Sequence, residues 1–156
     1  NISLNFYGRN ERWLEKDVEK YGLDEIVKLH GLISRREAIK MQRHSHMLLL
    51  ITWNDLRQDG IYTGKVFEYL AAKRPILSVG PSGGVVTDLL KQTNAGVHCS
   101  SVEEIKRVLC KMYNEFEYHK TVKFTGIDTE IDKYSHREMA LKFSQVLNKL
   151  DMNCRL

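Results

Sequence analysis

Paired cysteines, long apolar runs and blocks of like charge are all missing from this sequence. Its cysteines, Cys99, Cys110 and Cys154, are odd in number and have no Cys-x-x-Cys spacing, which favours reduced thiols and a cytoplasmic location over a disulfide-bonded secreted domain. No apolar run approaches the ~18 residues of a membrane-spanning helix, and no signal peptide is visible. The sequence therefore predicts no transmembrane segment.

Charged residues are present in moderate number and are well mixed. They make up 28% of the 156 residues, and the formal net charge is +4. Because no block of like charges forms a basic arm, nucleic acid is not an expected partner. A weakly basic surface suits an anionic small ligand. The length fits one globular domain that can bury its core without disulfides.

The apolar pattern predicts strands that alternate with helices. We expect strands at 2–7, 25–29, 47–52, 75–79 and 96–99, and helices at 11–21, 35–44, 65–73, 85–92, 102–117 and 135–150. Residues 120–132 are polar and are expected to be irregular. This alternation predicts an α/β fold with a doubly wound, Rossmann-like, mainly parallel sheet and helices on both faces.

Two local signals sharpen these expectations. Ser34 with Glu37, and Ser101 with Glu104, have the spacing of helix N-terminal caps. The run 47–51 is continuously apolar, as expected of a central parallel strand that is covered on both faces, and its expected partner is 75–79.

The stretch from 59 to 80, DGIYTGKVFEYLAAKRPILSVG, holds the strongest functional signal. If Thr63 caps the helix, the free backbone N–H groups near Gly64, Lys65 and Val66 point outward at the positive end of the helix dipole, and Lys65 adds a cation. Such an arrangement can hold a diphosphate. Glu68 follows three residues later on the same helical face, where a carboxylate can accept hydrogen bonds from a ribose diol. A nucleotide ligand fits both groups.

Other interpretations of this stretch stay open. Lys65 and Glu68 have the spacing of an ordinary surface ion pair, although the helix around them is nearly apolar. Residues 60–66 resemble a P-loop, but they are one residue short between the glycines and place Val66 where a magnesium-binding Ser or Thr is required. The loop 80–84 either brings backbone amides to a phosphate or sugar hydroxyl or is a plain tight turn. His44 and His46 have no third ligand at a convincing spacing, so no metal is expected.

The string GKVFEYLAAKRPILSVG resembles the donor-binding segment of GT-B glycosyltransferases of the large retaining family (group 1), which includes many capsule and lipopolysaccharide sugar transferases. The likeness extends to residues 27–33 and 47–51, and so covers about residues 2–150. It implies the C-terminal, donor-nucleotide-binding half of a two-domain enzyme. Residues 1–156 would then be a single nucleotide-sugar-binding domain excised from a longer protein.

The resemblance also implies roles for individual residues. Glu68 matches the position that binds the ribose of the donor nucleotide, and the turn Gly31, Leu32 and Ile33 matches the segment that receives the base. Thr63, Gly64 and Lys65 match positions near the diphosphate. The sequence departs from the family where many members carry the first acid of a Glu-x7-Glu pair. Gly60 stands at that position, which leaves Asp59, one residue out of register, as a weak candidate for a catalytic or sugar-contacting acid.

The activity implied by the resemblance is transfer of a sugar from a nucleoside-diphosphate sugar to an acceptor hydroxyl, in capsular or surface polysaccharide biosynthesis. No metal or other cofactor is expected. The acceptor would be held by an N-terminal half that this sequence lacks, so the fragment alone is expected to be inactive. The expected location is the cytoplasm, with the inner face of the membrane as an alternative. A non-catalytic nucleotide-binding or interaction module and a sugar-nucleotide epimerase of the same architecture stay open as other functions.

Overall fold

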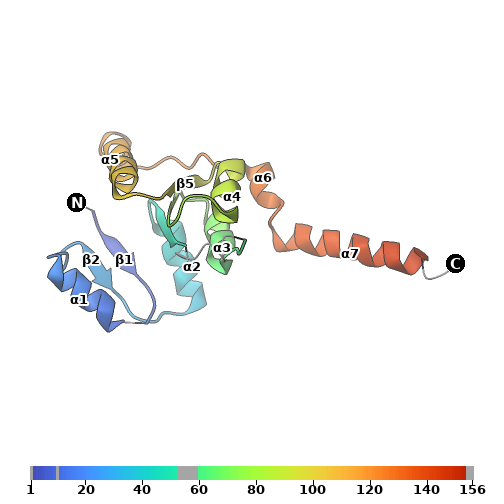
Figure 1. The fold of residues 1–156 in the computed structure, drawn as a ribbon, viewed down its shortest axis with the longest axis horizontal. Helices are drawn as coiled ribbons and strands as arrows, with labels where there is room; N and C mark the ends of the chain where they lie inside the picture. The colour runs from blue at the N-terminus through green and yellow to red at the C-terminus, as the bar shows by residue number, and fades with distance from the viewer. Residues whose placement is uncertain (1, 10, 53–59, 154–156) are drawn as a thin grey trace. The chain divides into compact units, whose positions relative to one another are not determined.

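Strands and helices alternate along the chain (Figure 1). The computed structural model describes residues 2–9, 11–52 and 60–153, with side chains up to residue 150. In chain order the elements are β1 (Leu4–Phe6), α1 (Arg12–Lys20), β2 (Val27–Leu29), α2 (Arg35–His44), β3 (Leu48–Ile51), α3 (Gly64–Ala72), β4 (Ile76–Val79), α4 (Val85–Thr93), β5 (Gly96–Cys99), α5 (Val102–His119), α6 (Asp128–Asp132) and α7 (His136–Asn153). The expected elements are found with their ends shifted by at most a few residues, and α6 is an additional element.

The chain divides into two compact units, residues 1–41 and 42–156. In the first unit, β1 and β2 pair in parallel, with Leu4 opposite Val27. In the second unit, β3, β4 and β5 form a parallel sheet in that order. The protein is therefore an α/β protein with two small parallel sheets among the described residues. A single nucleotide-sugar-binding domain over residues 1–156 stays a prediction.

The expected pairing of 47–52 with 75–79 is confirmed. β3 and β4 run parallel in the register that places Leu48 opposite Ile76 and Ile51 opposite Val79. β4, rather than β3, is the middle strand of this sheet in the described part of the chain. Ile76, Leu77 and Ser78 are all buried. Because successive residues of a strand point to opposite faces, both faces of β4 are covered.

The expected N-terminal caps are confirmed by their hydrogen bonds. At α2 the backbone N–H of Ser34 donates to the Glu37 carboxylate at 3.0 Å, and the N–H of Glu37 donates to Ser34 Oγ at 3.2 Å. These bonds from Ser34 hold the pKa of the Glu37 carboxyl below its usual value. At α5 the N–H of Glu104 donates to Ser101 Oγ at 3.2 Å. Local sequence therefore decides where both helices begin.

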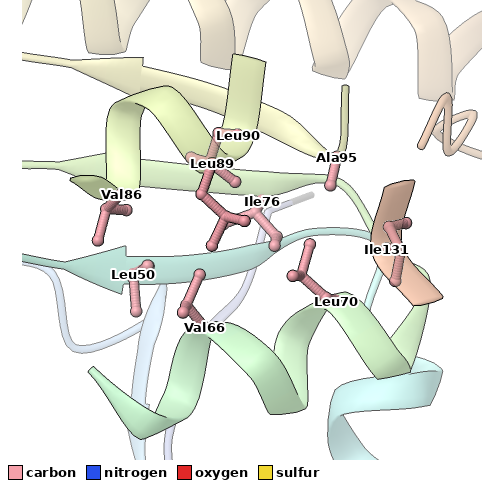
Figure 2. Close-up of a cluster of buried hydrophobic side chains, with 9 residues drawn as sticks. All are labelled: Leu50, Val66, Leu70, Ile76, Val86, Leu89, Leu90, Ala95 and Ile131. Carbon is pink, nitrogen blue, oxygen red and sulfur yellow. The ribbon is translucent and has the colours of Figure 1, made fainter. Parts of the chain in front are cut away.

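α3 and α4 pack their apolar faces against β3 and β4. Figure 2 shows nine buried apolar side chains that meet there: Leu50, Val66, Leu70, Ile76, Val86, Leu89, Leu90, Ala95 and Ile131. Burial of this set from water is the main favourable contribution to the folding of the second unit.

The prediction that residues 120–132 are irregular is wrong at its end, where α6 forms. The segment is fastened to the C-terminal end of α4: Asn94 Nδ2 donates to the carbonyl of Thr125 at 2.8 Å, and the N–H of Ile127 donates to the carbonyl of Thr93 at 2.8 Å. Ile131 of α6 then enters the core beside α3 and α4. These contacts are remote in sequence, so no local pattern signals them.

The C-terminal helix expected at 135–150 is present as α7, and its apolar stripe is exposed. Met139, Phe143, Val146, Leu147 and Leu150 are each at least half exposed. Among the described residues, no helix combines the length and the apolar character needed to cross a bilayer. Cys110 is also exposed, whereas Cys99 is buried.

Candidate functional site

The starts of α3 and α4 lie at one edge of the second sheet. Each helix follows a parallel strand, α3 after β3 and α4 after β4, so each begins on the side where the strands end. Val66 and Val86, from the first turns of the two helices, lie on either side of Leu50 near the arrowhead of β3 (Figure 2). This edge is where open α/β sheets bind ligands.

Thr63 occupies the N-cap position of α3 but does not cap it with its side chain. Its backbone is extended, with φ −75° and ψ 138°, and its hydroxyl makes no capping hydrogen bond. Oγ1 of Thr63 is buried and has no hydrogen-bond partner among the described residues. A buried hydroxyl without a partner costs free energy.

Gly64 and Lys65 open α3 with exposed backbone. The expectation of a free N–H at Val66 is wrong, because this group donates to the carbonyl of Thr63 at 3.1 Å. Within the described ranges, no acceptor is bonded to the N–H groups of Gly64 and Lys65. The Lys65 side chain is exposed and, in the part of the chain that the structure describes, forms no ion pair with Glu68. The surface ion pair considered as an alternative is therefore not formed. Two bare amides, a lysine and the helix dipole together favour an anion.

Glu68 lies about one turn beyond Lys65 and is half-buried. Gln42 of α2 donates a hydrogen bond from Nε2 to Glu68 Oε2 at 3.4 Å. The carboxylate is thus neither in the interior nor fully in solvent, and the bond from Gln42 helps to orient it. Gln42 escaped the sequence analysis because its contact with Glu68 spans 26 positions and belongs to no motif.

An aromatic cluster stands beside the start of α3. The ring of Tyr62 lies 5.5 Å from that of Phe67, and Phe67 lies 6.0 Å from Tyr134. Burial raises the pKa of Tyr62, and its interactions with Tyr134 and Asp88 raise it further. Asp88 belongs to the first turn of α4.

The expected base-binding turn belongs to the first unit and is described within it. Gly31 has a positive φ of 72°, a conformation that glycine adopts without strain, and its carbonyl accepts a hydrogen bond from the N–H of Gly8 at 2.9 Å. Leu32 is 74% exposed, and Ile33 is half-buried. Just before this turn, the ring of His30 stacks on that of Tyr7 at 4.5 Å.

The weak catalytic candidate Asp59 lies outside the described residues. Gly60, which takes the place of the first acid of the Glu-x7-Glu pair, is exposed. His46 packs edge-on against the ring of Phe116 at 4.6 Å. Within residues 2–9, 11–52 and 60–153, no three side chains of the metal-binding types gather closely enough to hold an ion.

No protein-family model, curated protein or solved structure matches this chain. Its function is therefore inferred from the residues at the start of α3 and from the resemblance of the sequence to one family.

Proposed function

We propose that this chain is the donor-nucleotide-binding half of a GT-B glycosyltransferase with a Rossmann-like fold. In this proposal the chain holds a nucleoside-diphosphate sugar at the carboxyl edge of its parallel strands. The enzyme transfers the sugar to an acceptor hydroxyl, in the synthesis of capsular or other surface polysaccharide. The proposed location is the cytoplasm, including the inner face of the membrane, because acceptors in such pathways are often lipid-linked.

The observation that supports the proposal most directly is the start of α3. Gly64 and Lys65 offer backbone N–H groups without bonded acceptors in the described ranges, the hydroxyl of Thr63 has no partner there, and Lys65 contributes an exposed positive charge. Glu68 follows one turn later as a half-buried acceptor. Anion donors and a polyol acceptor on one helix match the two ends of a ribose diphosphate.

Each group has a part in the proposed reaction. The amides of Gly64 and Lys65 and the ammonium of Lys65 stabilise the negative charge that develops on the diphosphate as its bond to the anomeric carbon breaks. The acceptor oxygen forms the new bond to that carbon and loses its proton to solvent or a base in the acceptor half. Glu68 fixes the ribose.

A non-catalytic nucleotide-binding or interaction module is the second candidate, and one observation favours it. Gly60 cannot contact a sugar hydroxyl through a carboxylate, so the site lacks an acid that many members of the resembled family carry. The two candidates differ in turnover: the transferase forms glycosylated product when combined with its acceptor half, whereas the module binds nucleotide and forms none.

Calorimetric titration of the intact chain with UDP, GDP and ADP tests the proposal. We expect at least one diphosphate to bind, and Glu68→Ala to weaken that binding about tenfold or more, because a hydrogen bond to a charged group contributes ~1.5–3 kcal/mol. Glu103→Ala, which removes an exposed carboxylate from α5, is the matched control and should bind as the unsubstituted chain does.

The ribose assignment has its own test within the same experiment. The unsubstituted chain should bind the 2′,3′-dideoxy analogue more weakly than the normal nucleotide. Glu68→Ala should bind the two nucleotides equally well, since the substitution and the missing hydroxyls remove the same interaction. Equal losses in both backgrounds, or unchanged affinity in Glu68→Ala, would remove Glu68 from the site. Absence of binding by all three diphosphates would refute the proposed function.

A further inference from the structure

We propose that His98 is a positioning residue that holds the loop 80–84 in place beside the start of α3, and that it thereby raises the affinity for a nucleoside diphosphate. This inference rests on the proposed function, because the start of α3 is the proposed diphosphate site. His98 lies in β5, and neither the sequence motifs nor the family resemblance draws attention to it.

His98 links the middle strand of the sheet to the loop. Its Nδ1 lies 3.0 Å from Oγ of Ser78, and its Nε2 lies 2.7 Å from the carbonyl oxygen of Pro81. Ser78 is opposite His98 in the β4–β5 register and is fully buried, at 0% exposure. The ring is therefore held at one end by the core of the sheet and holds the loop at the other.

The chemistry of the two partners fixes the protons. The carbonyl of Pro81 can only accept a hydrogen bond, so Nε2 of His98 must carry a proton. In the neutral ring Nδ1 then accepts from the hydroxyl of Ser78. Both ring nitrogens and the buried hydroxyl are satisfied by this one arrangement. Rotation of the ring out of it would leave a fully buried hydroxyl without a partner, which costs free energy.

The loop is held at its two ends as well. Gly80 packs so closely on Thr52, at the end of β3, that a side chain on Gly80 would collide with the Thr52 hydroxyl. The N–H of Gly80 donates to the carbonyl of Cys99 at 3.2 Å. At the other end, the hydroxyl of Thr87 donates to the carbonyl of Gly83 at 2.7 Å. Between these ends, His98 is bonded to the carbonyl of Pro81.

The loop borders the proposed site because it leads from β4 into α4, whose first turn adjoins that of α3. Val86 and Val66 meet around Leu50 in one buried cluster (Figure 2). A displacement of the loop would shift the first turn of α4, which packs through Val86 into the same buried cluster as Val66 of α3. Fixing the loop before the ligand arrives removes the cost of ordering it on binding.

Two substitutions of His98 by amide side chains distinguish the effect of the hydrogen bond to Pro81 from the effect of having a polar side chain at this position. Nε2 of glutamine stands at the same number of bonds from Cβ as Nε2 of histidine, so His98→Gln can still donate to the carbonyl of Pro81. The shorter asparagine places its nitrogen at the level of histidine Nδ1, so His98→Asn reaches Ser78 but not Pro81. Both side chains have room, because His98 lines an open cavity of about 380 Å³ with Leu90, Lys91 and Val97.

The experiment measures nucleotide affinity and loop order in the intact chain. Calorimetry with UDP, GDP and ADP should show that His98→Asn binds the preferred diphosphate about fivefold more weakly, the factor that one neutral hydrogen bond contributes, and that His98→Gln stays within about twofold of the unsubstituted chain. NMR order parameters of the amides of Ser82, Gly83 and Gly84 should fall in His98→Asn only. Melting temperatures confirm that both variants are folded.

The outcomes distinguish the two proposals. Unchanged affinity in His98→Asn, or an equal loss in His98→Gln, would overturn the role of His98 while leaving the site at α3 intact. Absence of diphosphate binding by the unsubstituted chain would instead refute the proposed function. In that case the NMR order parameters test whether His98 positions the loop. Equal order of the loop amides in His98→Asn and His98→Gln would overturn this role.

Discussion

The backbone N–H of Gly64 can be removed without disturbing the helix that carries it, which makes it the sharpest test of the site. Gly64 is the first residue of α3, where proline is favoured because its missing N–H has no partner within the helix. The preceding Thr63 already has ψ 138°, inside the range of about +120° to +160° that a following proline requires. Gly64→Pro should therefore fold, and should lose one proposed ligand contact.

Gly64→Ala is the matched control because it keeps the N–H. A Cβ at Gly64 meets nothing within 4 Å, and Gly64 is not among the glycines with positive φ. Alanine should therefore fit and should slightly favour the helix. Both substitutions reduce the conformational entropy of the unfolded chain. They differ in the backbone N–H at position 64, which alanine keeps and proline lacks.

The expected loss in Gly64→Pro follows from the charge of the partner. A hydrogen bond from an N–H to a diphosphate oxygen is charge-assisted and contributes ~1.5–3 kcal/mol, which corresponds to a loss of about 10- to 100-fold in affinity. Calorimetric titration with UDP, GDP and ADP measures it, and thermal unfolding should show that neither variant is destabilised. Equal affinities in Gly64→Pro and Gly64→Ala would refute the assignment of the start of α3 as the diphosphate site.

Three further outcomes are expected. Thr63→Val removes the unpartnered buried hydroxyl and should raise the free energy of unfolding by about 1 kcal/mol; unchanged stability would contradict this. Gly96→Ala places a Cβ against the carbonyl of Ile76 and should lower thermal stability by ~1–3 kcal/mol, whereas Gly60→Ala, with nothing nearby, should not. Hydrogen bonds from Ser100 lower the pKa of the Glu104 carboxyl. The ionised Glu104 therefore stabilises the fold above its ordinary pKa of 4.5, and this stabilisation is lost as the pH falls through the lowered pKa. Glu104→Gln should lose less stability in acid than the unsubstituted chain, as measured by the melting temperature at a series of pH values.

Local sequence was enough to predict the parts of the fold that depend on neighbours in the chain. The hydrogen bonds between Ser34 and Glu37 form as their spacing predicts, and the apolar run that contains Leu48 and Leu50 forms a parallel strand. Both signals act over a few residues, so no knowledge of the rest of the chain is needed to interpret them.

The parts of the site that sequence could not predict depend on partners far away in the chain. The bond from Gln42 to Glu68 and the link from Ser78 through His98 to Pro81 form only when separate elements come together. Thr63 is a case in which a local signal was misleading. Its residue type and position indicated a capping side chain, yet its hydroxyl is buried and has no hydrogen-bond partner among the described residues.

The contacts between α6 and α4 make completion of the core of the second unit depend on residues that are synthesised late. Ile131 joins a core whose other members end at Ala95, and the chain between them is held to α4 by Asn94 and Thr93. A nascent chain that has just completed β5 therefore still shows an uncovered apolar patch between α3 and α4. We expect that patch to close only after α6 has been synthesised, and transiently exposed apolar surface of this kind favours aggregation.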